Sequence, residues 1–465
     1  MMPIGVGIAI FCGLFFGALL WVLSLPKLMI LIAGSAFALT VMRTPLIGLL
    51  IFAFVAAFLP YSTLEVGVRT TASEALLALT WVGVLWQGFL SKQPRLYPRS
   101  GTERALGWLL MWSAIPFVVG QFVIQAEGGG PTNWIRWMLN LSAMFLVIRL
   151  IQDDNTAEKL TVAMLLGTLA MLLLSLGVFA KSRDANALTP ILTALKYPHQ
   201  AYLEDMFTAG TTRLSTPWLH PNSTGGALAI TIPVALFFAL PRPGWKRALG
   251  LSVALLGSAG LLLSGSRGAL LSLGLVVIWM ASRRVPYTAR ILIAGIAFGC
   301  MLVLVYPPLQ ERLATMFLSS NASTGIRLQE YAMFPEAMAR YPLGIGFKVD
   351  PPVPGSGLMG ISNLWLNFIY KLGVPGMLLF IAVTWFWWRE TRPYLGAVRV
   401  TRENSLWLGC SSGLLCALLT GIFDHYFSLT YVLIAFFWLF IGLTLQQVRL
   451  HPEIISPMPT RRASP

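Results

Sequence analysis

Residues 248–282 read ALGLSVALLGSAGLLLSGSRGALLSLGLVVIWMAS, which is two uncharged apolar runs joined by a turn around Arg267. Apolar runs of this kind recur from one end of the chain to the other. A helix of about 20 apolar residues crosses the hydrocarbon core of a bilayer. The stretch therefore predicts an all-α polytopic integral membrane protein.

The composition of the whole chain agrees with this prediction. Its 465 residues are 56% hydrophobic and only 11% charged, with a mean hydropathy of +0.73, whereas a soluble domain carries about 25% charged residues. These values exclude a soluble enzyme, a disordered protein and a fibrous one. The four cysteines all lie in apolar segments without Cys/His ligand spacing, so we expect neither a disulfide framework nor a zinc site.

The expected membrane helices number about 12–14. The lower number applies if 28–42 and 46–60, which are short, form a re-entrant pair around the Arg43-Thr44-Pro45 turn. Gly373 and Pro375 should kink another helix. The first span lacks a basic leader and a cleavage site, so it is expected to be a retained helix. The candidate spans are 4–24, 28–42, 46–60, 75–90, 105–123, 133–150, 159–179, 222–240, 248–264, 268–282, 291–306, 361–388, 404–423 and 428–447.

Loop charge predicts how these helices are oriented. The chain has 33 Lys and Arg against 18 Asp and Glu, a formal net charge of +15, and most of the cations fall in short loops on one side. The sequence has no basic patch with interleaved aromatic residues of the kind that binds nucleic acid. The positive-inside rule places both termini on the cytoplasmic side of an inner membrane. The expected regions are helices at 1–179, a periplasmic loop at 180–221, central helices at 222–306, a large periplasmic loop at 307–360, helices at 361–447 and a cytoplasmic tail at 448–465.

The large loop carries a second prediction. Apolar residues recur near helical spacing over 324–338, which indicates a short amphipathic helix at the outer membrane–water boundary. Arg327 begins this segment, so backbone N–H groups near it should also face an anion. Taken by itself, a solvated helix face is the simpler explanation of Arg327.

Several other polar groups stand at the outer ends of the expected helices. An arginine at Arg267, so close to hydrocarbon, favours an anion such as a phosphate, and Ser264 and Ser266 would add donors. The alternative is an arginine that snorkels to the interface. Before the span at 222–240, Arg213 and His220 lack a simple structural explanation.

Two further segments have both a structural and a functional interpretation. Asn222 or Ser223 should cap the helix at 222–240, and Trp218 should anchor at the interface. The adjacent Asp424 and His425 could transfer a proton or end a helix. Nucleotide-binding and metalloprotease motifs are absent, and the loop at 61–74 has only the separated acids Glu65 and Glu74. The pattern suits a substrate with an anionic phosphate and a lipid tail.

In their order along the chain, these blocks resemble the O-antigen ligase / O-antigen polymerase superfamily of bacterial membrane glycosyltransferases. The similar blocks are Arg213 to Asn222, the Ser-x-Ser-Arg-Gly at 264–268, Arg327 followed by the Tyr-Pro-Leu-Gly-Ile-Gly at 341–346, and Asn363 followed by Gly373 and Gly376. They cover roughly 210–390. The ligases carry a histidine two residues before this asparagine, and Ile361 occupies that position here.

The resemblance implies a metal-independent enzyme without a cofactor, which transfers a glycan from undecaprenyl diphosphate at the periplasmic face. It implies that Arg213, Arg267 and Arg327 bind the diphosphate. Arginines can stabilise the charge that develops on such a leaving group. Polymerase-like relatives carry an Asp-His-Tyr similar to that at 424–426, so His425 or His220 would replace the missing ligase histidine as the base.

These features favour a polymerase of O-antigen or exopolysaccharide units, with a ligase that uses a lipid A core as the alternative. Its partners would be the lipid-linked glycan, the bilayer and a chain-length regulator or export complex. A flippase is a weaker hypothesis because no internal repeat is visible. A non-catalytic scaffold of an export machine is the third, and it would leave Arg267 and Arg327 individually dispensable.

Overall fold

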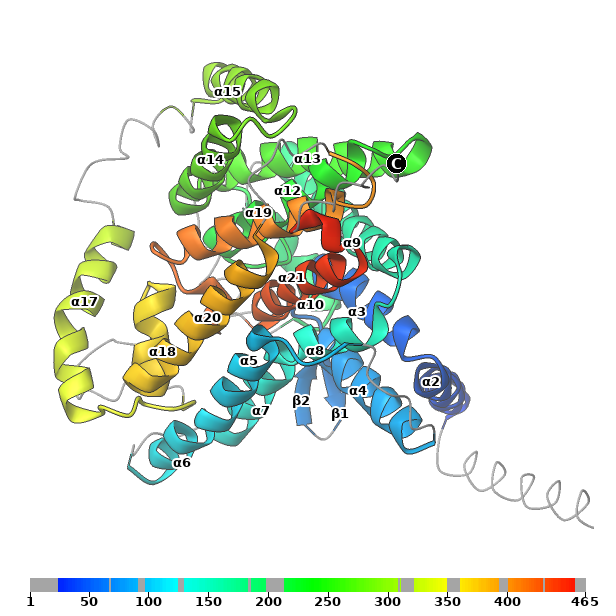
Figure 1. Ribbon diagram of the computed structural model, residues 1–465, viewed down its shortest axis with the longest axis vertical. Coiled ribbons are helices and arrows are strands. Elements are labelled where there is room, and N and C mark those ends of the chain that lie inside the picture. The colour runs from blue at the N-terminus through cyan, green and yellow to red at the C-terminus, as the bar shows by residue number, and fades with distance from the viewer. Residues whose placement is uncertain are drawn as a thin grey trace, which may run out of the picture.

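The computed structural model describes residues 24–66, 68–90, 97–123, 129–182, 185–197, 213–307, 310, 322–348, 360–392, 400–429 and 431–455. The predicted span at 4–24, Cys12 and most of the tail lie outside these residues. Helices make up nearly all of the described chain (Figure 1). They are α2 (Leu25–Arg43), α3 (Pro45–Phe58), α4 (Ala72–Leu90), α5 (Gly101–Trp112), α6 (Ala114–Val123), α7 (Gly130–Leu141), α8 (Ala143–Leu150), α9 (Asp154–Ser182), α10 (Thr189–Ala194), α12 (Pro221–Ala239), α13 (Gly244–Ser264), α14 (Arg267–Ser282), α15 (Thr288–Val305), α17 (Ala322–Arg340), α18 (Leu364–Thr391), α19 (Ser405–Thr420), α20 (Tyr426–Leu429) and α21 (Tyr431–Leu450), with short 3-10 turns η1 (Ala185–Leu188) and η2 (Pro452–Ile454).

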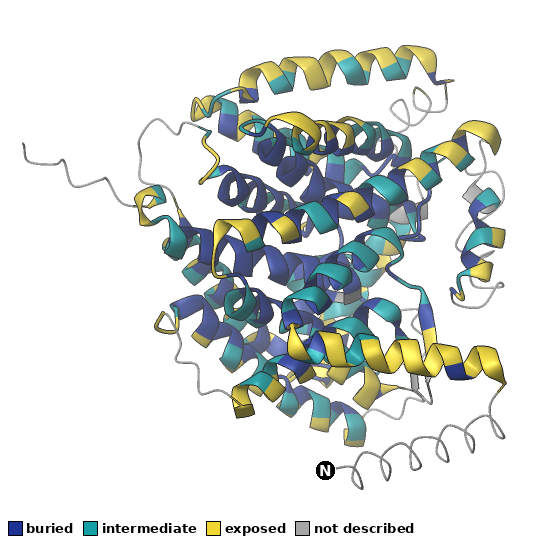
Figure 2. Cartoon of the chain, turned by 90° about the vertical axis from the view of Figure 1, so that its right-hand side faces the viewer, coloured by how far each residue is buried: buried dark blue, intermediate teal, exposed yellow. Residues whose placement is uncertain are grey.

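The predicted all-α membrane architecture is confirmed. Within the described residues, nine helical segments are long and apolar enough to cross a membrane, and α3, α14 and α19 are shorter apolar helices. Helices α12 and α21 are buried along almost their whole length, which is the pattern of a helix that is apolar on all sides. Helices α2 and α15 lie at the margins and are largely exposed (Figure 2). The core is therefore built around α12 and α21, with α13 and α19 packed on α12.

Two of the expected long spans are interrupted. The segment predicted at 105–123 is α5 and α6, broken at Ser113, and that at 133–150 is α7 and α8, broken at Ser142. Each serine hydroxyl donates to a carbonyl three residues earlier, at 2.6 Å, and accepts an indole N–H from Trp134 or Trp81. A serine that bonds back to the helix backbone competes with the regular hydrogen-bond ladder, and here a tryptophan from another helix stabilises that arrangement.

Two of the segments between the predicted spans contain regular structure. Strands β1 (Thr63–Val66) and β2 (Val68–Thr71) form an antiparallel hairpin in the segment 61–74, with Thr63 opposite Thr71. The loop predicted at 180–221 begins with the end of α9, η1 and α10, and Ser62 donates to the carbonyl of Leu195 at 3.1 Å. The Thr63 backbone N–H also donates to the carbonyl of Lys196 at 3.3 Å, so the hairpin supports the turn after α10.

Helix α18 is kinked where the sequence predicted it. Gly373 has φ +68°, a conformation that glycine adopts without steric cost. The kink leaves the carbonyls of Tyr370 and Lys371 to accept the backbone N–H groups of Ile345 and Gly346, at 2.9 and 3.0 Å. A Cβ at Gly344 would lie 2.5 Å from the carbonyl oxygen of Lys371. The glycines of 341–346 and the kink of α18 therefore form one docking unit.

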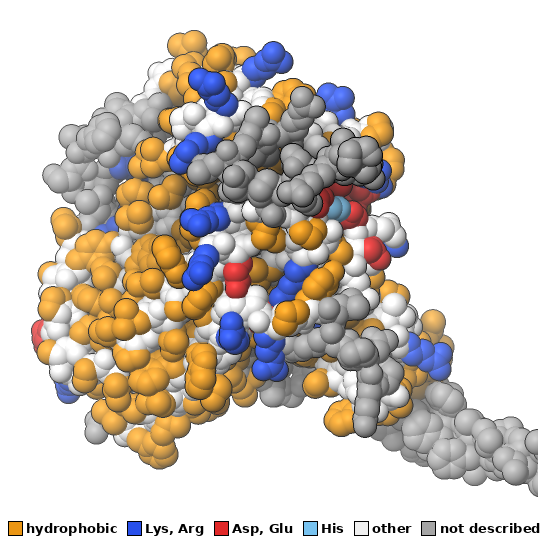
Figure 3. Space-filling view, in the orientation of Figure 1, with side chains coloured by type: hydrophobic (Ala, Val, Ile, Leu, Met, Phe, Trp, Pro, Cys, Tyr) orange, Lys and Arg blue, Asp and Glu red, His pale blue; other side chains and the backbone are white. Residues whose placement is uncertain are grey.

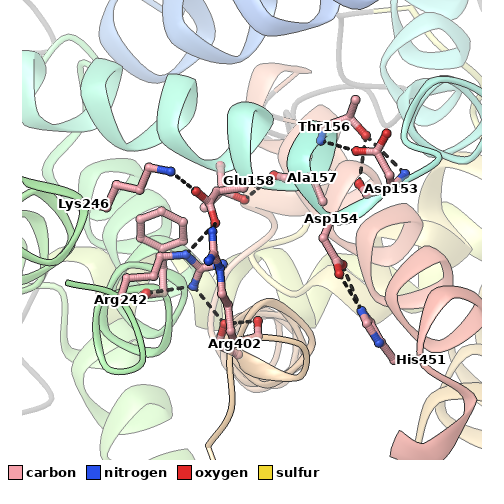
Figure 4. Close-up of polar contacts among 12 residues, drawn as sticks. Asp153, Asp154, Thr156, Ala157, Glu158, Arg242, Lys246, Arg402 and His451 are labelled. Carbon is pink, nitrogen blue, oxygen red and sulfur yellow. Dashed lines mark hydrogen bonds and ion pairs between the residues drawn. The ribbon is translucent and has the colours of Figure 1, made fainter. Parts of the chain in front are cut away.

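An ion network holds one end of the bundle together. The buried carboxylate of Glu158, on α9, accepts from Arg242 at 2.9 Å, from Lys246 and from Arg402 at 3.2 Å (Figure 4). Nearby, Asp154 pairs with His451 at 2.9 Å. The network lies at the start of α9, α13 and α19 and the end of α12 and α21, and we call this end of the bundle the basic end.

Candidate functional site

The opposite end of the same helices gathers most of the residues that the sequence singled out. The start of α12 is tied to the end of α13 by Arg213. Its Nε donates to the carbonyl of Ser264 at 2.7 Å, and its Nη2 donates to the Asn222 Oδ1 at 2.6 Å. Both acceptors are neutral oxygens, and these two bonds orient the guanidinium.

His220 is the N-cap of α12, which corrects the prediction that Asn222 or Ser223 caps it. Its Nδ1 accepts the backbone N–H of Asn222 at 3.1 Å, because the Asn222 side chain is engaged by Arg213. Burial, followed by the charge of Arg213, lowers the pKa of His220 to about 4. The imidazole is therefore neutral at pH 7, and with Nδ1 as acceptor its proton resides on Nε2.

Trp218 was predicted to anchor at the interface, and that prediction was wrong. The side chain is buried, and its ring meets Tyr61 and Phe436 at centroid distances of 6.0 and 6.2 Å. Packing against the aromatic core around α21 buries the large apolar surface of this side chain, so it does not lie at the interface.

The turn at 264–268 lies directly beside α12. Gly265 has φ +59° and ends α13, and α14 begins at Arg267. Ser266 is buried against Gly225, where an added Cβ would come within 2.3 Å of the serine Cβ. Gly268 likewise lies against Phe423. This close packing places the backbone of Arg267 between α12 and the segment that carries Asp424. Ser264 donates to the carbonyl of Leu261 at 2.7 Å, so its role is to close the turn.

Arg327 reaches the site from the large loop. The predicted amphipathic helix is present as α17, but it begins at Ala322, so Arg327 lies in its second turn. The expectation that backbone N–H groups near Arg327 face an anion was wrong, because only the first four N–H groups of a helix lack intrahelical acceptors. The guanidinium Nη2 instead pairs with Asp424 Oδ2 at 3.3 Å.

Helix α17 is fastened to the start of α18. Glu330 accepts the backbone N–H of Ser362 at 2.8 Å, and the Tyr331 hydroxyl donates to the Ser362 carbonyl at 3.1 Å. Asn363 is the N-cap of α18, accepts from the backbone of Trp365 and Leu366, and donates to the Ile422 carbonyl at 3.0 Å. Asn363 is therefore a structural residue that joins α18 to the 421–425 segment.

Asp424 is the hub of the site. Its carboxylate accepts from Arg327, from the hydroxyl of Tyr426 and from the backbone N–H of His425 at 2.9 Å. The His425 Nδ1 lies 3.4 Å from Oδ1 of the same carboxylate. Burial and the neighbouring Asp424 raise the pKa of Tyr426 above its ordinary value, so this phenol stays protonated and donates. The predicted Asp–His pair is present, and it is shared with a tyrosine and an arginine.

Ile361 stands where the ligases carry a histidine, and it is completely buried. It packs in a cluster with Ala337, Tyr341, Ile345 and Tyr370. The position is therefore part of the apolar cluster that supports α17.

The structure thus brings Arg213, His220, Asn222, Asp424 and His425 together with the Ser264–Arg267 turn and Arg327. The residues lie close enough together that the charges of Arg213, Asp424, His425 and Arg327 all act on the pKa of His220. The sequence did not single out Glu330, which resembled one more polar position of an amphipathic helix. Tyr331 counted only as an apolar position of the expected helix, and Tyr426 only as the last residue of the Asp-His-Tyr motif. The position of Tyr426, two residues after Asp424, was the one indication in the sequence that its hydroxyl could reach the carboxylate.

Comparison with known families bears on this same region. Residues 251–381 match the family model for O-antigen ligase, and this segment includes Arg267, Arg327 and Asn363. The search of curated proteins gave no match to the chain. The members of this family are enzymes that transfer glycosyl groups, so the match supports an activity of that general class. The match therefore supports, over residues 251–381, the resemblance to the O-antigen ligase/polymerase superfamily that the sequence shows.

Proposed function

We propose that the chain is a glycosyltransferase of the bacterial inner membrane that polymerises undecaprenyl-diphosphate-linked oligosaccharide units at its periplasmic face. The observation that carries the proposal is the convergence of Arg213, the Arg267 turn and Arg327 on the Asp424–His425 pair. A diphosphate leaving group needs fixed cations, and an acceptor hydroxyl needs a base, and both occur at one end of the bundle.

The proposed reaction is a displacement at the anomeric carbon. The acceptor hydroxyl oxygen forms the new glycosidic bond while the bond from the anomeric carbon to the diphosphate oxygen breaks. The departing undecaprenyl diphosphate carries the electron pair, and the arginines stabilise its charge. The proton of the acceptor hydroxyl passes to the base. No step in this scheme requires a cofactor.

The two histidines differ in what they can contribute. His220 accepts a backbone N–H at Nδ1, so its neutral ring presents an N–H at Nε2 and can only donate there. The His425 Nδ1 lies 3.4 Å from a carboxylate oxygen of Asp424 without a hydrogen bond between them, and an Nδ1–H that turned to this oxygen would leave Nε2 to accept a proton. We therefore assign the base to His425 and the donation of a hydrogen bond to the substrate to His220. Asp424 is the positioning residue for both His425 and Arg327.

The buried Ile361 favours a polymerase over a ligase, because the ligase histidine has no counterpart there. The first alternative is a ligase that transfers a finished glycan to a lipid A core. The second alternative is a non-catalytic scaffold. Partners of the proposed polymerase are the lipid-linked glycan and a chain-length regulator or export complex.

The test is complementation of a deletion strain, with lipid-linked and surface polysaccharide separated on gels. The variants are Arg267→Ala, Arg327→Ala and His425→Ala, and Arg290→Ala at the basic end is the matched control. A polymerase predicts single repeat units without long chains in the deletion strain and in the three site variants, at normal protein levels.

Other outcomes have defined meanings. Long chains that stall on undecaprenyl diphosphate would make the chain a ligase. Normal polysaccharide in both arginine variants would exclude the catalytic role and favour the non-catalytic scaffold. Full activity of His425→Ala alone would remove His425 as the base, and His220→Ala would then be compared with it.

A further inference from the structure

A pocket of about 800 Å³ lies at the basic end of the bundle, far from the site around Asp424. It is bounded by the second half of α4, one face along the length of α5, the end of α8 and the end of α21. Helix α21 starts near Asp424 and ends at this pocket, so the two regions are separated by the length of that helix. The proposed glycan chemistry makes no use of the pocket.

One wall of the pocket is apolar and aromatic. It includes Trp81, Leu85, Phe89, Trp108 and Met111. Phe89 is 86% exposed and Trp108 is 61% exposed, although both belong to segments that are apolar enough to span a membrane. Exposed apolar side chains on such segments face lipid tails. The wall is therefore continuous with the surface that the bilayer covers.

The mouth of the pocket is cationic. Arg99, Arg104, Arg149 and Arg449 line it, with Glu103 as the acidic residue among its lining. Glu103 is already paired with Arg449 at 2.5 Å. Within the described part of the chain, no carboxylate is paired with Arg99, Arg104 or Arg149, and we call these three the pocket arginines. Figure 3 shows Lys and Arg side chains in a band on one face, with hydrophobic side chains on both sides of it.

We propose that this pocket binds an anionic phospholipid, with its phosphate on the pocket arginines and an acyl chain along the α4–α5 wall. Guanidinium groups bind phosphate oxygens by paired, charge-assisted hydrogen bonds. Basic pockets between membrane helices that adjoin apolar walls select anionic head groups over zwitterionic ones. Both halves of the ligand, charge and tail, have a counterpart here.

The pocket can be filled without disturbing the fold. Gly107 lies on α5 in the lining, and a Cβ added there would meet no atom within 4 Å. Gly107→Leu therefore occupies space meant for the ligand. Gly274, on α14, is equally open and lies outside the pocket, so Gly274→Leu is the matched control.

The experiment is lipid titration of the purified full-length chain in detergent, read by native mass spectrometry. The probes are phosphatidylglycerol, phosphatidylcholine, undecaprenyl phosphate and inorganic phosphate. The charge variant is Arg99→Gln/Arg104→Gln/Arg149→Gln, and its control is Arg283→Gln/Arg284→Gln/Arg290→Gln, which removes the same charge from the loop region between α14 and α15 and from α15.

Phosphatidylglycerol should bind the wild type at least about tenfold more tightly than phosphatidylcholine. The charge variant and Gly107→Leu should each lose at least about tenfold in affinity, while both controls keep it. Retention of phosphatidylglycerol by Gly107→Leu and the charge variant would overturn the site. Equal binding of phosphatidylcholine would overturn recognition of the head group. Stronger binding of undecaprenyl phosphate or of inorganic phosphate alone would overturn the phospholipid as the occupant.

Discussion

Glu158→Gln should be among the most destabilising single changes at the basic end of the bundle. The carboxylate is 8% exposed and serves three cations whose exposure differs widely: 3% for Arg242, 33% for Lys246 and 64% for Arg402. Arg242 is held further by the Phe238 carbonyl and by Ser405, each at 2.9 Å. Loss of the carboxylate charge would leave a buried guanidinium without its counter-ion.

The magnitude follows from that burial. Removal of one partner from a buried ion pair costs about 3–5 kcal/mol, whereas an exposed pair contributes about 0–1 kcal/mol. We therefore expect Glu158→Gln to cost about 3 kcal/mol or more, and Arg402→Gln less than about 1 kcal/mol. In Tm this is a fall of roughly 3–10 °C against a fall of under about 2 °C.

The assay is thermal unfolding of the purified chain in detergent, followed by size-exclusion chromatography with fluorescence detection. The double variant Glu158→Met/Arg242→Met adds a sharper comparison. It should be more stable than Glu158→Gln, because it removes the stranded cation together with its partner. Equal Tm values for Glu158→Gln and Arg402→Gln, or a double variant less stable than Glu158→Gln, would refute this account of the network.

Three further predictions concern the site end and the α18 kink. Because the pKa of His220 is lowered to about 4, the unfolded chain takes up this proton first; stability should fall as pH drops from about 6.5 to about 4, and His220→Gln should flatten that fall in pH-dependent unfolding. Gly373→Ala should cost about 1–3 kcal/mol, because φ is +68° and its Cβ would lie 2.8 Å from the backbone of Leu343, while Gly274→Ala leaves Tm unchanged or raises it slightly. Arg327→Gln and Asp424→Asn should each reduce polysaccharide at least about tenfold, and the double variant should be no worse than the worse single, since residues that act as a unit are not additive; additive losses would separate the two roles.

The architecture was predictable because bilayer crossing leaves few choices. An uncharged apolar run in a membrane must satisfy its own backbone, and a helix does this within one segment. The kink at Gly373 was predictable for a similar reason, since glycine and proline act on the local backbone. The breaks at Ser113 and Ser142 were not predictable, because each depends on a tryptophan from a different helix.

The sequence indicated which residues belong to the candidate site, but not which of them contact one another. Arginines and the Asp-His pair stand out at helix ends in an apolar chain. Their partners are set by tertiary packing: Arg327 and Asp424 are separated by 97 positions, and Arg213 and Ser264 by 51. The N-cap of α12 was misassigned for this reason, because Arg213 takes the Asn222 side chain and leaves the cap to His220.

The two ends of the bundle differ in how accessible their paired cations are. At the basic end, the buried carboxylate of Glu158 pairs with Arg242, and this network connects α9, α12 and α19. At the other end, a carbonyl and an amide orient Arg213, and Asp424 pairs with Arg327. Burial is the main cause of the low pKa of His220 there, and the charge of Arg213 adds to it. Because the side chain of Arg327 is 29% exposed and that of Arg242 only 3%, an anion can reach the cation at the site end and not the one at the basic end.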